Sequence, residues 1–181
     1  MSGGATFLQL RAKHLGGGAF LDLAAAAAEL AHAAGARVVV NDRADLATLS
    51  GADGVHVGQD DLAPADVRRI VGGESVVGLS THTSEQLARA IEMPVSYVAI
   101  GPVFETATKQ TGYDAVGLAM VRTAAATAAR RGLPLVAIGG ITLARARSVV
   151  DAGAASVAVI GDLLAGGDPE RRVREYLETL G

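Results

Sequence analysis

The stretch GVHVGQDDLAPADVRRIV, residues 54–71, contains a short apolar strand pattern, a polar turn and an amphipathic helix pattern. Its two valines predict a buried strand over 54–57, and Pro64 is a favourable first residue for a helix over 64–71. The same order recurs along the whole chain. Further strands are predicted over 6–10, 37–40, 76–79, 97–100, 135–138 and 157–160, and further helices over 20–34, 45–49, 84–92, 116–131, 143–152 and 169–180.

Strands that alternate with helices predict a parallel sheet, either open and doubly wound or closed as a barrel. Polar residues follow nearly every predicted strand, whereas an open sheet would concentrate its site at one switch point. This favours a (β/α)8 TIM-type barrel, formed as a single domain over residues 1–181. Seven units are found, so we expect the first βα unit to be missing, and either upstream sequence or a second subunit to cover the strand edge.

Composition excludes several classes of function. The 181 residues include no cysteine, which excludes disulfide scaffolds and cysteine-ligated metal centres and favours a cytoplasmic location. The net charge of −3 provides no basic field for nucleic acid. The longest apolar run, residues 23–28, is far shorter than the roughly 20 residues that span a bilayer. We therefore expect small-molecule substrates and neither nucleic acid nor membrane partners, while homo-oligomer formation stays open.

Polar side chains gather after the predicted strands in a chemically consistent set. Arginine and lysine neutralise phosphate oxygens, and carboxylates hold Mg²⁺, which in turn bridges to phosphates. The set predicts an anion and metal site, although each member alone has a structural explanation as a helix cap, a turn residue or a surface charge. Its members are Gln9, Arg11, Lys13, Asn41, Asp42, Gln59, Asp60, Asp61, Ser80, Thr81, His82, Thr106, Thr108 and Lys109.

Two further segments suit a phosphate ligand. Gly139 and Gly140 follow an apolar run and would let backbone N–H groups approach an oxyanion, late in a barrel where phosphate commonly binds. Residues 106–112 form a long connection that either closes over a ligand or is an ordinary surface loop. His82 is the only histidine at the end of a predicted strand, so an acid–base role for it is weighed against a structural one.

Six segments resemble the thiamine phosphate synthase family, in order and at its spacing. The resemblance covers about residues 6–164, and six motifs in register are far more specific than any one of them. The segments are QLRAK (9–13), NDRAD (41–45), GVHVGQDD (54–61), GLSTHT (78–83), GPVFETATK (101–109) and AIGGI (137–141).

The resemblance implies an Mg²⁺-dependent transferase that joins a hydroxymethylpyrimidine diphosphate to a thiazole phosphate. It implies that Asp42 and Asp61 bind the metal, with Asp60 the less favoured of the adjacent pair. It also implies contacts to the pyrimidine diphosphate from Gln9, Arg11, Lys13, Asn41, Ser80 and Lys109, among which Arg11, Lys13, Ser80 and Lys109 are the expected catalytic residues. The thiazole phosphate is expected at Thr106, Thr108, Gly140, Ile160 and Gly161.

Two other functions compete with this interpretation. The related thiazole tautomerases are isomerases on the same barrel, but that enzyme type is expected to place a histidine where this chain has Pro102. A non-catalytic phosphate-binding remnant is the other alternative, suggested by the missing unit. Departures from the family pattern include Ala12, Glu105, Ala107 and Gly161.

Lys109 provides a test of the predicted anion site. It is one of only two lysines in the chain, and its expected task is to neutralise the departing diphosphate, so Lys109→Ala should lower kcat more than substrate binding. Steady-state kinetics with each substrate varied in turn checks this. An unchanged kcat would mean that Lys109 is merely a surface charge.

Overall fold

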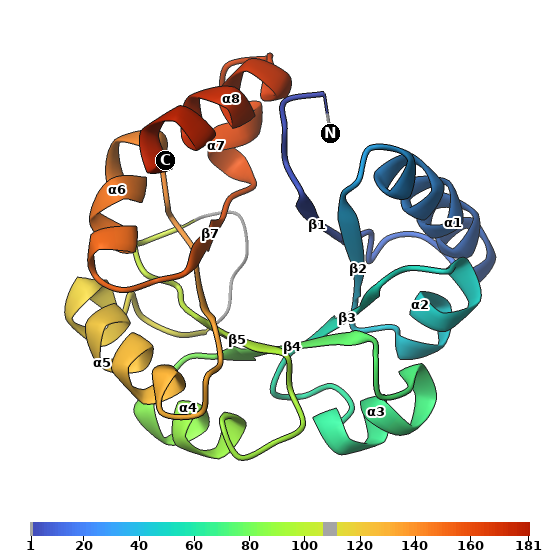
Figure 1. Cartoon of the computed structure of the whole chain (residues 1–181), viewed down its shortest axis with the longest axis horizontal. Coiled ribbons are helices and arrows are strands. Elements are labelled where there is room, and N and C mark those ends of the chain that lie inside the picture. The colour runs from blue at the N-terminus through green and yellow to red at the C-terminus, as the bar shows by residue number, and fades with distance from the viewer. Residues whose placement is uncertain (1, 107–111) are drawn as a thin grey trace. The chain divides into compact units, whose positions relative to one another are not determined.

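The computed structural model describes residues 2–106 and 112–181 (Figure 1). The chain divides into two compact units, the first over residues 5–79 and the second over residues 80–181 together with residues 2–4. The expectation of a single domain stays a prediction.

The first unit is an alternating run of strands and helices. Parallel pairing joins β1 to β2, β2 to β3 and β3 to β4, so strands that follow one another in the sequence are neighbours in the sheet. The elements are β1 (Phe7–Leu10), α1 (Gly17–Ala33), β2 (Arg37–Asn41), α2 (Ala44–Ser50), β3 (Gly54–Val57), α3 (Pro64–Val71) and β4 (Val76–Thr81), whose last two residues belong to the second unit.

Valine fills the core of the first unit. Residues 38–40 and the valines of β3 are almost completely buried, as expected for parallel strands covered on both faces. Alanines at positions 24, 28 and 31 form the buried side of α1, and their small size lets this helix approach the sheet closely. The helices α1, α2 and α3 follow one another along the unit (Figure 1).

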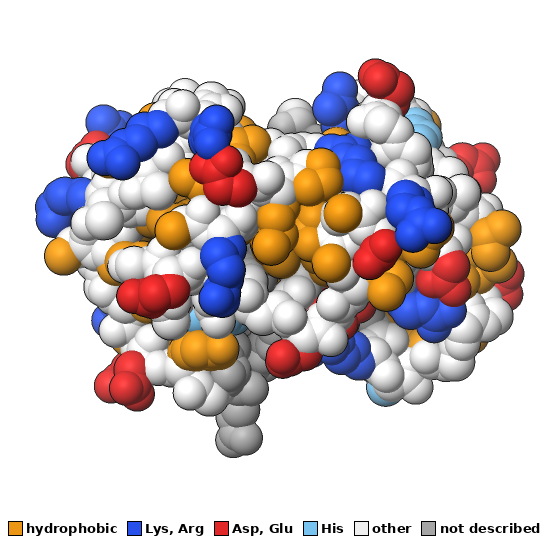
Figure 2. Space-filling model, turned by 90° about the horizontal axis from the view of Figure 1, so that it is seen from below, with side chains coloured by type: hydrophobic (Ala, Val, Ile, Leu, Met, Phe, Trp, Pro, Cys, Tyr) orange, Lys and Arg blue, Asp and Glu red, His pale blue; other side chains and the backbone are white. Residues whose placement is uncertain are grey.

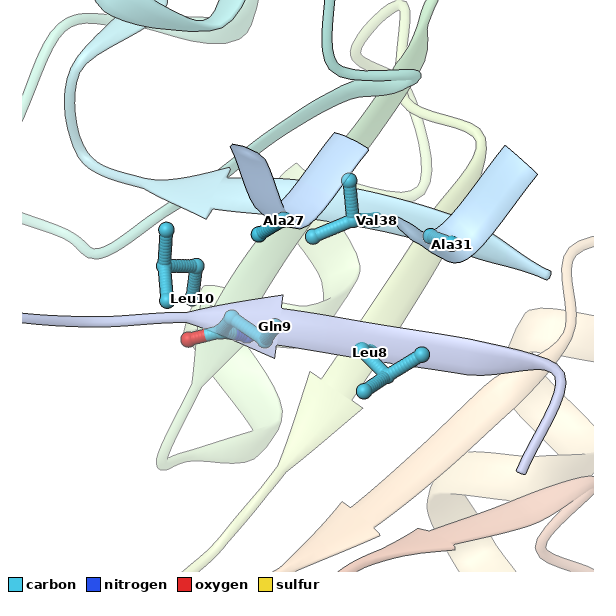
Figure 3. Close-up of a pocket in the computed structure, with 6 residues that line it drawn as sticks. All are labelled: Leu8, Gln9, Leu10, Ala27, Ala31 and Val38. Carbon is cyan, nitrogen blue, oxygen red and sulfur yellow. The ribbon is translucent and has the colours of Figure 1, made fainter. Parts of the chain in front are cut away.

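A small apolar cavity of about 80 Å³ lies between β1 and α1 (Figure 3). Its lining residues are Leu8, Gln9, Leu10, Ala27, Ala31 and Val38. Leu8 and Leu10 pack there against the buried alanines of α1. With Gln9 as its one polar side chain, this cavity is unsuited to a diphosphate.

The second unit continues the same alternation. β5 pairs in parallel with β6 and β6 with β7, and the Thr81 hydroxyl at the end of β4 donates to the Ala99 carbonyl of β5 (2.8 Å). The elements are α4 (Ser84–Ala90), β5 (Tyr97–Ile100), α5 (Gly117–Ala129), β6 (Leu135–Ile138), α6 (Leu143–Asp151), β7 (Ser156–Ala158), α7 (Gly161–Leu164) and α8 (Pro169–Leu180).

Strand order distinguishes the two architectures that the sequence allowed. The seven strands lie in the order β1 to β7 without reversal, whereas a doubly wound sheet reverses its order at a switch point. The chain therefore has the TIM-type (β/α) topology with seven strands, and this expectation is confirmed.

Most predicted elements match the observed ones, with one clear error. The bounds of β3, α3, β5, β6 and α8 are those expected. The strand predicted over 157–160 is wrong at its end, because β7 stops at Ala158 and Ile160 already precedes α7. The four-residue helix α7 was not predicted, since so short a segment has no apolar periodicity.

The described surface carries charges of both signs close together. Ion pairs join Arg43 to Asp45, Arg147 to Asp151 and Arg174 to Glu170, and blue and red side chains are interspersed on the face in Figure 2. No helix in residues 2–106 or 112–181 is both long and apolar enough to cross a membrane.

Gly54 tests how closely β3 and β4 approach each other. A Cβ atom at this position would lie 1.9 Å from the Val76 carbonyl oxygen, so the strands must separate to accept alanine. We expect Gly54→Ala to lower the free energy of unfolding by about 2 kcal/mol or more, measured by urea denaturation. Gly16→Ala is the control, because nothing lies within 4 Å of its added Cβ. Equal stability of the two variants would contradict the close approach.

Candidate functional site

A charged cluster lies at the carboxyl ends of the first strands. Asp42 directly follows β2, and Lys13 follows β1 by three residues. The Lys13 Nζ lies 2.8 Å from Asp42 Oδ2, with the Asp42 side chain mostly buried and that of Lys13 mostly exposed. Because parallel strands end at the same edge of a sheet, their consecutive loops bring these opposite charges together.

The backbone of Asp42 has an unusual conformation. Its φ angle of +63° makes it the one residue other than glycine with a positive φ in the described chain. The Asp42 N–H donates to the His56 carbonyl of β3 (2.8 Å), which holds the residue at the strand end. Aspartate and asparagine adopt this left-handed conformation more easily than other side chains. The choice of residue at position 42 is therefore restricted by the backbone conformation as well as by the side-chain contacts.

Asp61 joins this cluster from the loop after β3. Its Oδ2 accepts a hydrogen bond from the Gly58 N–H (2.8 Å), which holds the carboxyl group in the turn. Asp42 and Asp61 share a side-chain hydrogen bond, and the Asn41 side chain also hydrogen-bonds to Asp42. Three consecutive strand ends thus contribute Lys13, Asp42 and Asp61 to one cluster.

The two carboxyl groups titrate differently. Burial raises the pKa of Asp42, but hydrogen bonds to Lys13 and Asp61 and the charge of Lys13 outweigh burial and bring that pKa below its usual value. Burial also raises the pKa of Asp61; the Gly58 N–H opposes this rise, and the Asp42 carboxylate adds to it, so that the pKa of Asp61 lies above its usual value. The pair therefore favours a proton or a cation between its oxygens.

This donor set fits Mg²⁺. The ion prefers oxygen ligands, keeps several waters and is commonly held by one or two carboxylates together with substrate phosphates. No group of three or more His, Cys, Asp or Glu side chains suited to a metal occurs among the described residues. Two adjacent carboxylates with a lysine alongside therefore suit a metal whose remaining ligands come from water and a phosphorylated substrate.

The other predicted site residues of the first unit differ in their exposure to solvent. Asn41 is half-buried at the end of β2, whereas the Gln9 and Arg11 side chains are exposed. Asp60 is also exposed, and Asp61 rather than Asp60 contacts Asp42. Of this adjacent pair, Asp61 is therefore the residue whose carboxyl group lies beside Asp42.

The glycine pair of the second unit allows two backbone segments to touch. Val103 and Phe104 donate their N–H groups to the carbonyls of Ile138 (2.9 Å) and Gly139 (3.0 Å). A Cβ at Gly140 would lie 2.5 Å from the Glu105 carbonyl oxygen, and the Gly140 φ is +64°. Only glycine fits this position without displacing the neighbouring turn.

A second loop meets the one that carries Gly140. Asp162, the second residue of α7, accepts a hydrogen bond from the Leu143 N–H at the start of α6 (3.2 Å) and one from the Tyr176 hydroxyl (2.8 Å). Burial and the hydrogen bond to Asp162 raise the pKa of Tyr176. Asp162 thus links the loop after β6 to the turn formed by Ile160 and Gly161. The sequence offered no signal for this anchor.

The remaining predicted residues lie in the second unit. Ser80, at the end of β4, and Thr106 are half-buried; Thr108 and Lys109 lie outside the described residues. The His82 ring contacts the Gly101 carbonyl through Nδ1 and stacks on Tyr113, with centroids 4.1 Å apart. These contacts give His82 a packing role, and nothing in them requires acid–base chemistry.

Sequential parallel strands, clustered charges at their ends and a glycine-lined turn define a TIM-type (β/α) enzyme. The sequence model of the family described as thiamine monophosphate synthase matches residues 1–163. The chain belongs to this family.

Individual relatives agree with that assignment. A thiamine-phosphate synthase of Koribacter versatilis is 48% identical, covering 99% of this chain and 82% of the relative. One of Thermus thermophilus is 45% identical, over 99% and 85%. The solved thiamine phosphate pyrophosphorylase of Pyrococcus furiosus has a TM-score of 0.90 at 27% identity, over 99% of this chain and 84% of that structure.

The left-handed backbone of Asp42 provides a test that is separate from activity. Both Asp42→Asn and Asp42→Ala remove the ion pair with Lys13, but only asparagine tolerates the φ of +63° well. We expect the alanine variant to be less stable than the asparagine variant by about 1 kcal/mol, measured by urea denaturation. Equal stabilities would show that this backbone conformation is not maintained in solution.

Proposed function

We propose that this chain condenses 4-amino-2-methyl-5-(diphosphooxymethyl)pyrimidine with a thiazole phosphate, releasing diphosphate and forming thiamine phosphate. The observation that carries the proposal is the cluster of Lys13, Asp42 and Asp61 at three consecutive strand ends. Family membership supports it, as do relatives named for this synthase activity. We assign the reaction to the cytoplasm, following the cysteine-free composition.

The two substrates would use different residues. The pyrimidine diphosphate is assigned to Gln9, Arg11, Lys13, Asn41, Ser80 and Lys109. The thiazole phosphate is assigned to Thr106, Thr108, Gly140, Ile160 and Gly161. Support for the second set comes from the glycine-lined turn and from the hydrogen bond that brings the α7 turn to the start of α6.

Asp42 and Asp61 would hold Mg²⁺. When bound, this ion supplies Lewis-acid stabilisation of the negative charge on the diphosphate. The chain's own contribution is to keep the two carboxylates adjacent, with Asp61 held by the Gly58 N–H and Asp42 by the strand-end backbone.

The reaction needs charge stabilisation more than acid–base chemistry. The bond between the pyrimidine methylene carbon and the diphosphate oxygen breaks, and its electron pair leaves with diphosphate. Lys13 and Arg11 stabilise the charge that accumulates there. The lone pair of the thiazole nitrogen then forms the new carbon–nitrogen bond, which gives the thiazolium product. No protein nucleophile is required, so positioning of the two substrates is the main task of the chain.

Substitution of the carboxylates tests the proposed function. Asp42→Asn and Asp61→Asn should each lower Mg²⁺-dependent formation of thiamine phosphate by about 100-fold or more, because the charge that balances the metal is lost. Asp60→Asn is the matched control and should keep wild-type activity, since Asp60 is exposed beside the cluster. Excess EDTA should abolish the wild-type reaction. Full activity in EDTA, or in both cluster variants, would contradict the assignment.

A further inference from the structure

Arg145 lies beside the glycine loop of the second unit and belongs to none of the six motifs. It is the third residue of α6 (Leu143–Asp151). Its guanidinium carbon lies 4.7 Å from the centroid of the Phe104 ring, and its Nη1 donates to the Gly140 carbonyl at 3.3 Å. The cation is therefore held over an aromatic ring at the edge of the turn that contains Gly140.

The ring beneath this guanidinium is itself fixed to the same loop. The Phe104 N–H donates to the Gly139 carbonyl (3.0 Å), and the Phe104 carbonyl oxygen would lie 2.7 Å from a Cβ at Gly140. Arg145 and the glycine loop are thus positioned by one set of contacts. A guanidinium held in this way loses little conformational freedom when it binds a ligand.

The charge of Arg145 is not balanced within the described chain. No ion pair among residues 2–106 and 112–181 involves its guanidinium, whereas Arg147 on the same helix pairs with Asp151 at 2.9 Å. The first turn of α6 also lacks an acidic residue. A cation in this turn faces the positive end of the helix dipole, which disfavours it unless an anion is nearby.

The Asp162 carboxylate near this corner of the unit is already engaged. The Asp162 carboxylate accepts from the Leu143 N–H and the Tyr176 hydroxyl, and it lies 3.7 Å from the Arg172 guanidinium. The Glu105 side chain is exposed. Four of the five N–H donors of Arg145 have no hydrogen bond to a described residue.

We propose that Arg145 is a substrate-binding residue whose guanidinium donates hydrogen bonds to the phosphate of the thiazole substrate. This inference rests on the proposed function and deepens it. A phosphate at the Gly140 turn would meet backbone N–H groups and a planar cation whose fork of N–H donors matches its oxygens. Arg145 would then determine affinity for the phosphorylated thiazole over the unphosphorylated alcohol, without affecting the pyrimidine diphosphate.

Kinetics of Arg145→Gln, with Arg147→Gln as the matched control, test the assignment. Both residues are exposed on α6, and circular dichroism would verify that each variant folds. Arg145→Gln should raise the KM for the thiazole phosphate roughly tenfold while the KM for the pyrimidine diphosphate and the kcat change less than about twofold. Arg145→Lys should recover part of the affinity, and Arg147→Gln should behave as the wild type. An unchanged KM for the thiazole phosphate in Arg145→Gln would overturn the proposal.

A binding measurement separates this proposal from the synthase function. Calorimetric titration with inorganic phosphate should show weaker binding to Arg145→Gln than to Arg147→Gln, even if the wild type forms no thiamine phosphate. In that case the proposed function fails while the anion-binding role of Arg145 stands. Equal phosphate affinity in the two variants would overturn the anion-binding role, whatever the activity of the wild type.

Discussion

The contact of Asp42 with Lys13 and Asp61 is the constraint around which the first unit is arranged. It requires three consecutive parallel strands to end at one edge, and it requires a backbone at Asp42 that few residues tolerate. Two carboxylates brought together repel each other unless a cation or a proton lies between them. Lys13 offsets part of this repulsion, and under the proposed function a bound metal ion would offset the rest. Under that proposal, the bound metal ion would in turn attract the diphosphate, so the affinities for the two ligands would be coupled.

Close backbone contacts hold the glycine loop of the second unit in place. Gly140 lets the turn of residues 103–105 lie against the loop after β6, and Asp162 holds the start of α7 to the start of α6. These contacts bring the loop after β6 against two neighbouring turns. Arg145 adds a positive charge beside this loop, and that charge is held over the Phe104 ring.

Sequence alone predicted most of the fold, because β-branched runs bounded by glycine or aspartate define short buried strands. The strand over 54–57 is an example, because its valines favour a buried strand. The same reasoning failed at Val159 and Ile160, whose β-branched side chains suggested a strand although the chain already turns toward α7 there. The conformational preferences of the residues determine where long helices and strands form. Tertiary contacts determine where short strands end.

Contacts between candidate residues were predictable where the residues follow neighbouring strands, and unpredictable where the contacts depend on packing. The family resemblance implied that Asp42 and Asp61 act together, and their side chains interact at two neighbouring strand ends. Nothing in the sequence indicated the positive φ of Asp42, or that Arg145 would stack on a ring 41 positions earlier in the chain. Contacts of this kind join segments that are far apart in the sequence, so local sequence patterns do not predict them.

Thermodynamic coupling between metal and diphosphate tests the central claim most directly. Mn²⁺ can replace Mg²⁺ as a paramagnetic probe, and its binding can be followed by electron paramagnetic resonance with and without inorganic diphosphate. A shared site predicts that each ligand tightens the other by the same factor, and that Asp61→Asn loses this coupling while Asp60→Asn keeps it. Metal affinity that is independent of diphosphate, or coupling that is unchanged in Asp61→Asn, would contradict the account.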